Sequence, residues 1–517
     1  EEMALFEVYI RMLDDRSLGG EVIAAIIAGQ AAQSAWSSVI LKHVRTFQKM
    51  DDPYLRERAA DVNDLGKRVL GYLQRNQKKS LPLPRRIILV GEDLSASALA
   101  DIPVSRLVGI VSVKGSSNSH MAIVGRALGV PTVMGAVDLP WAEMEGHELI
   151  IDGFSGDVIS RASRSMRRVY LERQREEKQL AKDLEKLRDI PCVTPDGVPL
   201  SLWMNTGLRQ DIAIALKSSA QGVGLYRTEI PFLMRSSFPT EDEQTVIYRE
   251  QLQGFAPQPV TMRTLDIGGD KDLPYFPIEE ENPFLGWRGI RISLDHPEIF
   301  LAQIRAMLRA SEGLNNLRIM LPMISSVPEL DSALELIDRA YNELLQEEGY
   351  SIQRPQVGAM IEVPAAVYQV KELGRKVDFL SVGTNDLTQY LLAVDRNNPR
   401  VANLYHALHP SVLRALKIIH EQATAVNCQI SVCGEVAGDP LGAVVLLGLG
   451  YENLSMSANS LLKVKSMLNQ VSKSEARILA KRALRMSDAS SVSVFLSDAL
   501  NRPELSKLYR PVLVDKS

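Results

Sequence analysis

The chain has 517 residues, of which 45% are hydrophobic and 24% charged, and its formal net charge is −4. This length exceeds what one hydrophobic core supports, so two to four domains are expected, and the mild negative charge argues against a nucleic-acid or anionic-membrane surface. The three cysteines form no C-x-x-C pair, which argues against a disulfide framework and a thiolate zinc site.

Helical periodicity runs through the first part of the chain, which we assign to a helical subdomain at residues 1–79. Breaks are expected at Gly19-Gly20 and Asp51-Asp52-Pro53, and the apolar residues over 53–73 fall on one helical face. These residues are Leu55, Ala59, Val62, Leu65, Val69 and Leu70. The pattern is already under way at Met3 without a helix cap, so we expect a further segment upstream. No stretch suits a membrane span or a signal peptide, so we expect a cytoplasmic protein.

Short β-branched runs replace the helical pattern over residues 80–160 and indicate a compact α/β domain. The runs are Ile87–Val90, Val108–Val113, Thr132–Met134, Leu149–Ile151 and Val158-Ile159. One helical pattern, Ser119–Leu128, lies among them. Residues 161–192 follow as a linker, because Arg164–Arg188 is laced with charges and lacks glycine and proline, as a long exposed helix would.

Eight short apolar runs alternate with helical patterns over residues 193–517. They are Leu200–Asn205, Gly222–Tyr226, Val260–Leu265, Leu317–Met323, Val357–Ile361, Phe379–Val382, Ile430–Cys433 and Leu454–Met456. Eight strands alternating with helices predict a (β/α)8 barrel of the TIM type with a C-terminal extension, so the fold class is α/β. An open doubly wound sheet is the alternative.

Functional residues of such a barrel lie at the C-terminal ends of its strands. Polar residues lie at the ends of five predicted strands. Arg227 follows the second, Arg263 lies in the third, Glu362 follows the fifth, Asn385 and Asp386 follow the sixth, and Cys433 closes the seventh. One such residue alone is typical of a capping or solvated position, whereas their joint placement predicts a site at the barrel mouth.

The residue types at this mouth suit a small anion and a metal ion. Glu362 and Asp386 follow adjacent strands and would share one Mg²⁺, although Glu362 would also suit an ion pair and Asp386 a helix cap. Four arginines are candidates for bidentate contacts to a phosphate and a carboxylate: Arg227, Arg263, Arg288 and Arg396. The last two would equally suit surface ion pairs. Cys433 is either inert packing or a proton donor to a developing carbanion.

His120 ends a polar, glycine-led loop and directly precedes a helical pattern. Helix N-termini offer free N–H groups and positive potential, which suit a phosphoryl group on an imidazole that is partly unprotonated near neutral pH. Ser119 or Asn118 would cap the helix and orient the ring. A structural or merely exposed histidine is the alternative.

Together these motifs resemble the phosphoenolpyruvate-utilising enzymes, specifically Enzyme I of the bacterial phosphotransferase system. The resemblance covers essentially the whole chain. The histidine motif is Ser119-His120-Met121-Ala122 with Leu128–Gly135. The barrel motifs are Leu225–Glu229, Arg263–Lys271, Asn282–Arg288, Ile361–Pro364, Gly383–Tyr390 and Cys433-Gly434-Glu435.

The resemblance implies a phosphoenolpyruvate-protein phosphotransferase. His120 would accept the phosphoryl group and pass it to a histidine-containing phosphocarrier protein docked on the helical subdomain. Phosphoenolpyruvate would be held by Arg227, Arg263, Arg288, Asn385 and Arg396. Glu362 and Asp386 would bind Mg²⁺, and Cys433 would protonate the enolate of pyruvate. The resemblance further implies a swivelling histidine domain with a hinge near 161–188, and a homodimer formed through the barrel.

Three segments resemble the nitrogen-regulatory paralogue, which usually carries an upstream GAF sensory domain: Ser116–His120, Trp287–Ile292 and Arg396–Asn403. This resemblance implies the nitrogen-branch carrier as partner. Two departures are Asn118, where the sugar enzyme has Thr, and the missing first strand of the phosphohistidine domain. The alternatives are a sugar-branch Enzyme I, a phosphoenolpyruvate synthase or pyruvate phosphate dikinase without its nucleotide domain, and a regulator that binds partners according to phosphorylation.

Overall fold

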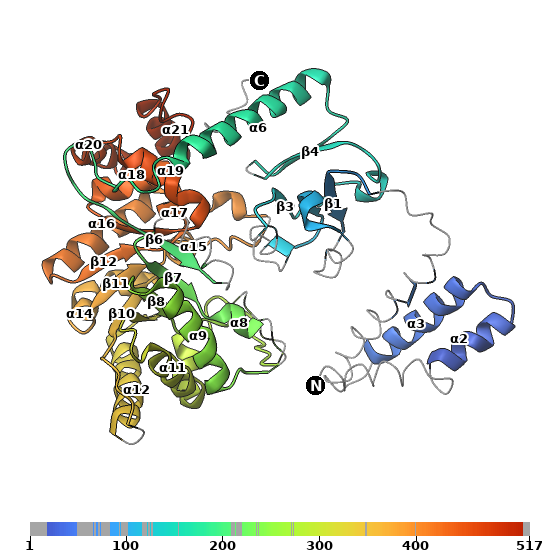
Figure 1. Ribbon diagram of the computed structural model, residues 1–517, viewed down its shortest axis with the longest axis horizontal. Coiled ribbons are helices and arrows are strands. Elements are labelled where there is room, and N and C mark those ends of the chain that lie inside the picture. The colour runs from blue at the N-terminus through green and yellow to red at the C-terminus, as the bar shows by residue number, and fades with distance from the viewer. Residues whose placement is uncertain are drawn as a thin grey trace. The chain divides into compact units, whose positions relative to one another are not determined.

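The computed structural model describes residues 18–48, 66, 69–70, 73, 83–92, 94, 102–115, 121–122, 125, 128–153, 155–207, 212, 220–233, 235, 237–269, 271, 273, 275–346, 349–398 and 400–509. The chain forms two compact units, Glu1–Ala162 and Ser163–Ser517, whose elements are labelled in Figure 1. None of the described helices combines the length and apolarity needed to cross a membrane.

Two helices open the described part of the first unit, α2 (Leu18–Ile27) and α3 (Ala32–Gln48). Trp36 of α3 is 4% exposed in a core shared with Val22 of α2, and its indole N–H donates to the carbonyl oxygen of Gly66 at 2.8 Å. Val69 and Leu70 pack against this small core, as the predicted apolar face requires. The rest of that face and the predicted break at 51–53 lie outside the described residues.

The predicted helix break at Gly19-Gly20 is wrong, because both glycines lie within α2. A glycine inside a helix costs only about 1 kcal/mol relative to alanine, which packing easily offsets. The helix ends instead at Ile27, and Gly29, with a φ of +96°, turns the chain just beyond it. The N–H groups of Gly29 and Gln30 donate back to the carbonyl oxygens of Ile26 and Ala25, which is the Schellman arrangement that closes a helix.

The rest of the first unit is a small α/β arrangement. Strands β1 (Ile87–Gly91), β2 (Leu107–Ser112) and β3 (Thr132–Met134) form a parallel sheet in that order, and β4 (Leu149–Asp152) pairs antiparallel with β5 (Asp157–Ser160). Short 3-10 turns lie at Val104–Arg106 and Trp141–Glu143. All five predicted strands are confirmed.

The predicted helix after the histidine loop is described only in part. Met121, Ala122 and Gly125 are helical, and Met121 is buried against Leu107 and Ile110 of β2. His120, Ser119 and Asn118 lie outside the described residues.

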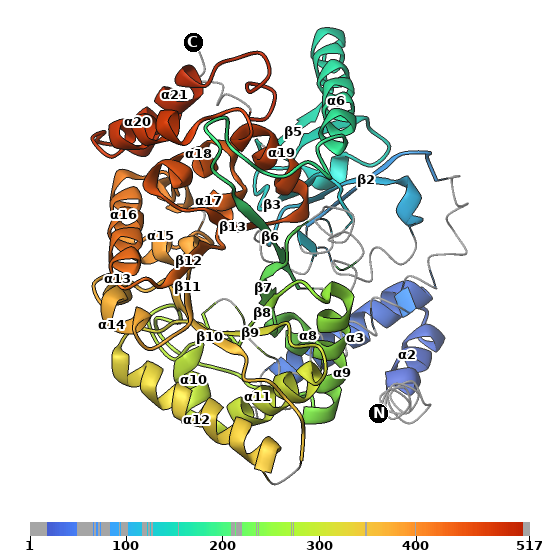
Figure 2. The same ribbon diagram turned by 60° about the vertical axis from the view of Figure 1, so that its left-hand side comes forward.

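The second unit contains a closed eight-stranded barrel of parallel strands. The strands are β6 (Ser201–Thr206), β7 (Val223–Arg227), β8 (Val260–Arg263), β9 (Leu317–Leu321), β10 (Gln356–Ile361), β11 (Phe379–Val382), β12 (Gln429–Val432) and β13 (Asn453–Met456). Each pairs with its sequence neighbours, and β13 closes on β6. The eight predicted strands and the barrel are confirmed, and the open-sheet alternative is wrong. Figure 2 shows the barrel with its surrounding helices.

A long helix and the barrel helices complete this unit. The predicted charged helix is α6 (Arg164–Glu185), which begins where the hydroxyl of Ser163 accepts from the N–H of Met166. The others are α8 (Glu229–Leu233), α9 (Glu241–Phe255), α10 (Ile290–Asp295), α11 (Pro297–Ser311), α12 (Val327–Gln346), α13 (Pro364–Val367), α14 (Val370–Gly374), α15 (Thr384–Leu392), a 3-10 turn (Ala402–Leu404), α16 (Pro410–Ala425), α17 (Glu435–Gly438), α18 (Pro440–Leu449), α19 (Ala458–Leu468), α20 (Lys473–Ala483) and α21 (Ala489–Ala499).

Barrel strands are buried on both faces, which is why they read as continuous apolar runs in the sequence. On β9, for example, all five residues are buried. Ile319 belongs to the core shared with the outer helices, whereas Met320 belongs to a separate cluster with Leu225, Met360, Phe379 and Cys433. The alternation of side chains along the strand therefore separates a helix-packed outer layer from a barrel interior.

Candidate active site

The C-terminal ends of the barrel strands carry the residues that the sequence singled out. Arg227 ends β7 and Arg263 ends β8, and the two are directly paired in the strand register. Glu362 follows β10, Asn385 and Asp386 lie in the first turn of α15 after β11, and Cys433 follows β12. Because all eight strands are parallel in one closed barrel, these ends share one mouth.

Two carboxylates that sequence reasoning missed anchor the cations of this mouth. Arg263 is 5% exposed, and its Nη2 donates to Oε1 of Glu229 at 2.6 Å and lies 3.1 Å from Oδ2 of Asp266. Lys271 donates to both acids, at 3.1 Å to Glu229 and 2.5 Å to Asp266. The sequence offered a signal for these two acids, because Glu229 follows Arg227 by two positions and Asp266 follows Arg263 by three.

The charges of this network decide its protonation. Burial alone would raise the pKa of Glu229, but the positive charges of Arg263 and Lys271 outweigh it and lower that pKa. The same balance holds the pKa of Asp266 well below its ordinary value, chiefly through Arg288. Both acids are therefore ionised at neutral pH and hold the cations in fixed positions.

Arg288 is fully buried, so the alternative of a surface ion pair is wrong for this residue. Its Nε and Nη2 donate to the two oxygens of Asp266 at 3.2 and 3.3 Å, a bidentate contact. Its Nη1 donates to Oδ1 of Asp386 at 3.0 Å and to the hydroxyl of Tyr390 at 3.3 Å. Arg288 thus joins the anchoring network to one of the two predicted metal ligands.

Only one of the two carboxylate oxygens of Glu362 has a hydrogen-bond donor among the described residues. Oε1 accepts the N–H of Met323 at 2.7 Å, while Oε2 is buried and has no hydrogen-bond partner among the described residues. Burial, and then the negative charges of Asp386 and Asp266, raise the pKa of Glu362 to about 7. None of the ion pairs among the described residues includes Glu362, which removes the arginine-pair alternative there.

Asp386 keeps its negative charge beside Glu362. Burial would raise the pKa of Asp386, but Arg288 and then Arg396 lower it below its ordinary value. Helix α15 begins after Gly383 without a side-chain cap, so Asp386 does not fill the capping role that was its alternative. A Cβ on Gly383 would lie 2.6 Å from Oε2 of Glu362, so the glycine leaves space beside the oxygen that lacks a partner.

This pair of acids fits a hard divalent cation. Within the described ranges no three or more His, Cys, Asp or Glu side chains cluster for a metal. Mg²⁺ is commonly held by one or two carboxylates, with water and substrate oxygens completing its octahedron. A buried carboxylate oxygen with no donor, next to a second ionised acid, is the arrangement that such an ion would relieve.

Asn385, in the first turn of α15, and Arg396, after that helix, follow the same strand end. Oδ1 of Asn385 accepts the N–H of Glu435 at 2.9 Å, which ties α15 to the segment after Cys433. Arg396 is half-buried after α15, and its N–H donates to Oε1 of Gln389 at 3.3 Å. The positive charge of Arg396 helps to lower the pKa of Asp386.

Cys433 is 3% exposed, and its thiol donates to the carbonyl oxygen of Val382 at 3.5 Å. Burial raises the pKa of this thiol to about 11. The group is therefore protonated at neutral pH, which suits a proton donor and not a thiolate nucleophile.

A cationic, carboxylate-bearing mouth on a parallel barrel suits an enzyme that acts on a small anionic substrate with the help of a cation. Comparison with known protein families identifies the family to which the chain belongs. The model of the PEP-utilising enzyme PEP-binding domain matches residues 181–473, that of the mobile domain matches 83–156, and that of the N-terminal domain matches 1–58. The chain belongs to the family of phosphoenolpyruvate-utilising enzymes, and the resemblance found in the sequence is confirmed.

Individual relatives cover nearly the whole chain. A protein named "Phosphoenolpyruvate-dependent phosphotransferase system" from Escherichia coli (strain K12) is 45% identical over 510 residues, which are 99% of this chain and 68% of that protein. A "Phosphoenolpyruvate-protein phosphotransferase" from Staphylococcus epidermidis is 38% identical over 499 residues, covering 95% and 86%. Among solved structures, "N-terminal domain of Enzyme 1 - Nitrogen" covers 33% of this chain and 69% of its own, with 38% identity and a TM-score of 0.23.

Proposed function

We propose that this chain is a phosphoenolpyruvate-protein phosphotransferase that phosphorylates its own His120 and passes the group to a histidine-containing phosphocarrier protein. The observation that carries the proposal is the buried oxygen of Glu362 beside Asp386, at a mouth lined by Arg227, Arg263 and Arg288. Relatives that are 38–45% identical over almost the whole chain support the same activity.

The barrel residues have separate tasks in this reaction. Arg227, Arg263, Arg288, Asn385 and Arg396 bind the phosphate and carboxylate of phosphoenolpyruvate. A divalent cation, in our proposal Mg²⁺, would be held by Glu362 and Asp386, and when bound it supplies charge neutralisation on the phosphate oxygens. The acids Glu229 and Asp266 hold the cationic side chains of Arg263, Lys271 and Arg288 in place, so little reorganisation is needed when the substrate arrives.

The transfer itself breaks one bond and makes one. A ring nitrogen of His120 attacks phosphorus in line as the phosphorus–oxygen bond to the enolate breaks. The electron pair left on the enolate takes a proton at its methylene carbon from the thiol of Cys433, which gives pyruvate. The thiolate regains its proton from solvent. Protonation of the carbon removes the leaving group from the reverse reaction.

The proposal is tested by incubating the protein with Mg²⁺ and phosphoenolpyruvate and measuring its intact mass. We expect a gain of one acid-labile phosphoryl group with one pyruvate released. His120→Ala should abolish the gain, because the acceptor nitrogen is lost, while His147→Ala in the same unit should keep it. An acid-labile phosphate that persists on His120→Ala would overturn the assignment. A requirement for a nucleotide would favour the phosphoenolpyruvate synthase or dikinase alternative.

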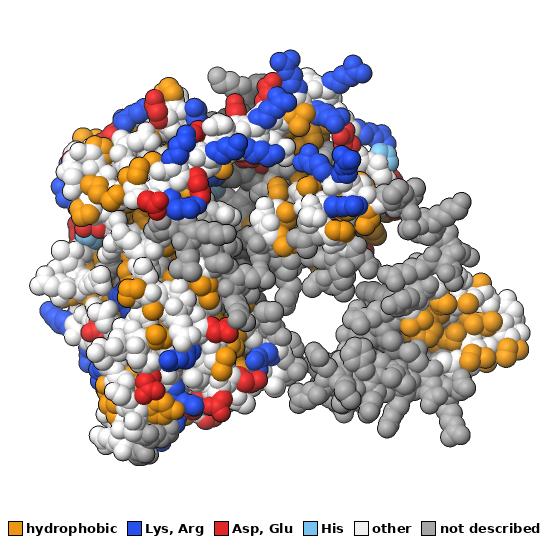
Figure 3. Space-filling model, in the orientation of Figure 1, with side chains coloured by type: hydrophobic (Ala, Val, Ile, Leu, Met, Phe, Trp, Pro, Cys, Tyr) orange, Lys and Arg blue, Asp and Glu red, His pale blue; other side chains and the backbone are white. Residues whose placement is uncertain are grey.

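An exposed apolar surface on the helical pair supports the carrier-docking role. Ile23, Ile26 and Ile27 recur on one side of α2 and are 48%, 39% and 82% exposed, and Leu41 of α3 is 47% exposed. Figure 3 shows hydrophobic side chains gathered on this helical pair. Apolar surface of this kind marks protein-binding sites on soluble domains.

Ile27→Asp is therefore expected to slow transfer to the carrier at least tenfold, about the loss when one apolar contact of ~1.5–3 kcal/mol is removed. Autophosphorylation of His120 should stay unchanged, because the barrel supplies it. The matched control is Ile478→Asp on α20, where the isoleucine is 71% exposed and no carrier contact is proposed. Equal carrier rates in the two variants would remove this face from the docking surface.

The carrier branch and the dimer rest on family resemblance, whereas the location and the domain bounds rest on residue patterns. We propose the nitrogen-branch carrier as partner, a homodimer through the barrel, a cytoplasmic location, and the division into 1–79, 80–160, 161–192 and 193–517. Transfer rates from phosphorylated protein to a purified nitrogen-branch carrier and a purified sugar-branch carrier decide the branch. Faster transfer to the sugar carrier would favour the sugar-branch alternative.

A further inference from the structure

The segment that follows β9 contains a residue in a strained backbone conformation beside the proposed cation site. Met323 lies two positions after the last residue of β9 and has a φ of +56°. Residues other than glycine rarely adopt this left-handed region, because their Cβ then crowds the neighbouring carbonyl oxygen. Met323 is also 3% exposed, so the packed interior holds this conformation in place.

The backbone N–H of Met323 determines how the carboxylate of Glu362 lies. It donates to Oε1 at 2.7 Å, while Oε2 is buried and has no hydrogen-bond partner among the described residues. Gly383 leaves space on the side of Oε2, because a Cβ there would lie 2.6 Å from that oxygen. With Oε1 held by Met323, Oε2 is the oxygen that stays available to a cation.

The side chain of Met323 packs against a position that suits only glycine. Gly289 has a φ of +58°, and a Cβ on it would lie 2.9 Å from Cγ of Met323 and 3.3 Å from Oδ1 of Asp266. The N–H of Gly289 donates to the carbonyl oxygen of Ile267 at 3.0 Å. Because Gly289 directly follows Arg288, this packing joins the segment after β9 to the network that Asp266 anchors.

We propose that Met323 is a positioning residue for the cation site, whose left-handed backbone directs its N–H to Oε1 of Glu362 and so leaves Oε2 for the cation. The inference rests on the proposed cation site of Glu362 and Asp386, and it adds a residue that contacts neither substrate nor cation. A strained backbone persists only where the surrounding structure holds it, and such residues cluster at functional sites. Partners that orient a metal ligand contribute about 10- to 100-fold to metal affinity.

Two substitutions of Met323 separate positioning from packing. Met323→Gly removes the side chain, but glycine adopts the left-handed region without strain, so its N–H can still reach Glu362. Met323→Val keeps more of the side chain, but a β-branched residue is strongly disfavoured in that region, so the N–H should move away from Oε1. Packing alone would make glycine the more damaging substitution, whereas positioning makes valine the more damaging one for cation binding.

The measurement is the affinity of the full chain for Mn²⁺, followed by electron paramagnetic resonance, with the thermal midpoint recorded for each variant. We expect Met323→Val to weaken Mn²⁺ binding at least about tenfold, and Met323→Gly to stay within about threefold of the wild type. Wild-type affinity in Met323→Val, or a glycine variant that binds as weakly as the valine variant, would overturn the proposal. If Met323→Val does not fold, Met323→Ala replaces it and should bind Mn²⁺ more weakly than Met323→Gly, because Cβ alone disfavours the left-handed region.

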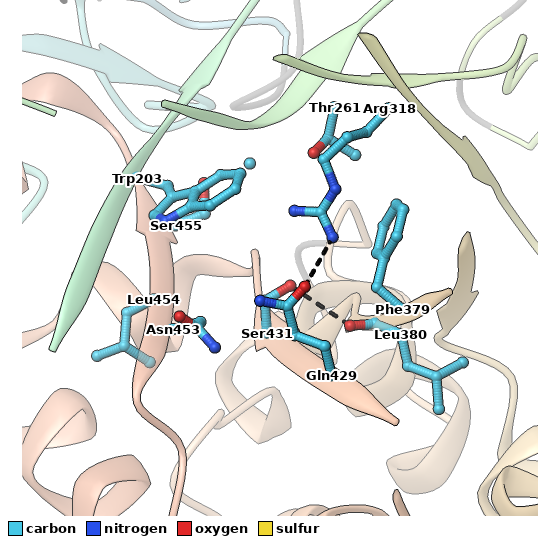
Figure 4. A pocket seen from close by; sticks show the side chains of 11 residues that line it. Trp203, Thr261, Arg318, Phe379, Leu380, Gln429, Ser431, Asn453, Leu454 and Ser455 are labelled. Carbon is cyan, nitrogen blue, oxygen red and sulfur yellow. Dashed lines mark hydrogen bonds between the residues drawn. The ribbon is translucent and has the colours of Figure 1, made fainter. Parts of the chain in front are cut away.

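Asn315→Val is the matched control for backbone strain. Asn315 is exposed, has a φ of +54°, and precedes β9 by two positions, at the end of the barrel where Figure 4 shows Arg318. The substitution places the same strain at the start of the same strand, so it should lower the thermal midpoint and leave Mn²⁺ affinity unchanged. If it weakens Mn²⁺ binding as much as Met323→Val does, the effect is a general loss of stability and the positioning role fails.

Glu362→Gln distinguishes failure of this inference from failure of the proposed cation site. If Glu362→Gln leaves Mn²⁺ affinity unchanged, the cation site itself is wrong, and the role of Met323 is lost with it. If Glu362→Gln weakens Mn²⁺ binding and Met323→Val does not, the cation site stands and only the positioning role is wrong. Weakening in both, with Met323→Gly close to the wild type, is the result that we expect.

Discussion

Replacing Glu362 with glutamine is expected to slow phosphorylation of His120 by about three orders of magnitude, which corresponds to ~4 kcal/mol of lost transition-state stabilisation. The glutamine has nearly the same shape, so the bond from the N–H of Met323 at 2.7 Å can persist. What is lost is the negative charge on the oxygen that lacks a partner. Asp386→Asn should have a similar effect and should also weaken the contact to Nη1 of Arg288 at 3.0 Å, while Asp266 keeps its bidentate contact to that arginine.

The pH dependence of the metal requirement distinguishes this role from a structural one. The pKa of Glu362 is raised to about 7, so the proton competes with the cation below that pH and not above it. The Mg²⁺ concentration for half-maximal rate should therefore rise about tenfold for each pH unit below ~7 in the wild type, and little above it. Glu362→Gln should flatten this dependence.

Binding of Mn²⁺ followed by electron paramagnetic resonance at several pH values provides the measurement without relying on turnover. Glu421→Gln is a suitable control, because this glutamate forms an exposed pair with Lys417 on α16. Control and wild type should show the same pH profile. An unchanged Mg²⁺ requirement in both Glu362→Gln and Asp386→Asn would mean that these acids serve the fold and do not bind a metal.

The barrel was predictable from sequence because its strands leave a strong local signal. A parallel strand covered on both faces must be apolar at nearly every position, and β9 with β11 illustrates this. The helix break at Gly19-Gly20 was predicted wrongly because glycine alone only weakens a helix. The actual end at Ile27 depends on the positive φ of Gly29 and on two backbone hydrogen bonds, neither of which a residue pattern reveals.

The site was predictable in its strand-end residues but not in its connections. Strand-end placement identified Arg263, Glu362 and Asp386, because the barrel fixes where each strand ends. Sequence spacing gave no means to pair Arg288 with Asp386, which are joined by a hydrogen bond across 98 positions. The burial of Arg288 could not be predicted from the sequence either. A surface ion pair was an open alternative for this residue, which the structure shows to be fully buried.

Burial at the other end of the barrel, where the strands begin, was equally hard to predict. Arg318 lies in the run that was predicted as a strand, and a single arginine in an apolar strand is usually assigned to an exposed edge. Only the closed barrel turns it inward, against the ring of Phe379 at 3.8 Å. Closure of the barrel thus buries charged side chains at both ends, the cluster at the mouth and Arg318 at the opposite end.

Cys433→Ser is expected to reduce pyruvate formation by at least a hundredfold while leaving phosphoenolpyruvate affinity within about twofold of the wild type, the range expected for loss of a general acid. The burial that raises the thiol pKa to about 11 keeps its proton in place at neutral pH. A serine hydroxyl is a far weaker acid, so it delivers that proton poorly even from the same position. Binding should survive because Arg263 and Arg288 are held by Glu229 and Asp266, not by Cys433.

The measurement is pyruvate formation in deuterated water, with the stereochemistry of the labelled methyl group determined on a chirally labelled substrate. In the wild type one face of the enolate should receive the proton, because the thiol is fixed by its bond to the carbonyl oxygen of Val382. In Cys433→Ser the residual pyruvate should be racemic at that carbon, since water then supplies the proton after the enolate is released. Cys428→Ser is the control, because this buried cysteine directly precedes β12 and so lies at the end of the strand opposite Cys433. Wild-type rate with wild-type stereochemistry in Cys433→Ser would return this cysteine to the packing role, beside Met320 and Met360 in the barrel interior.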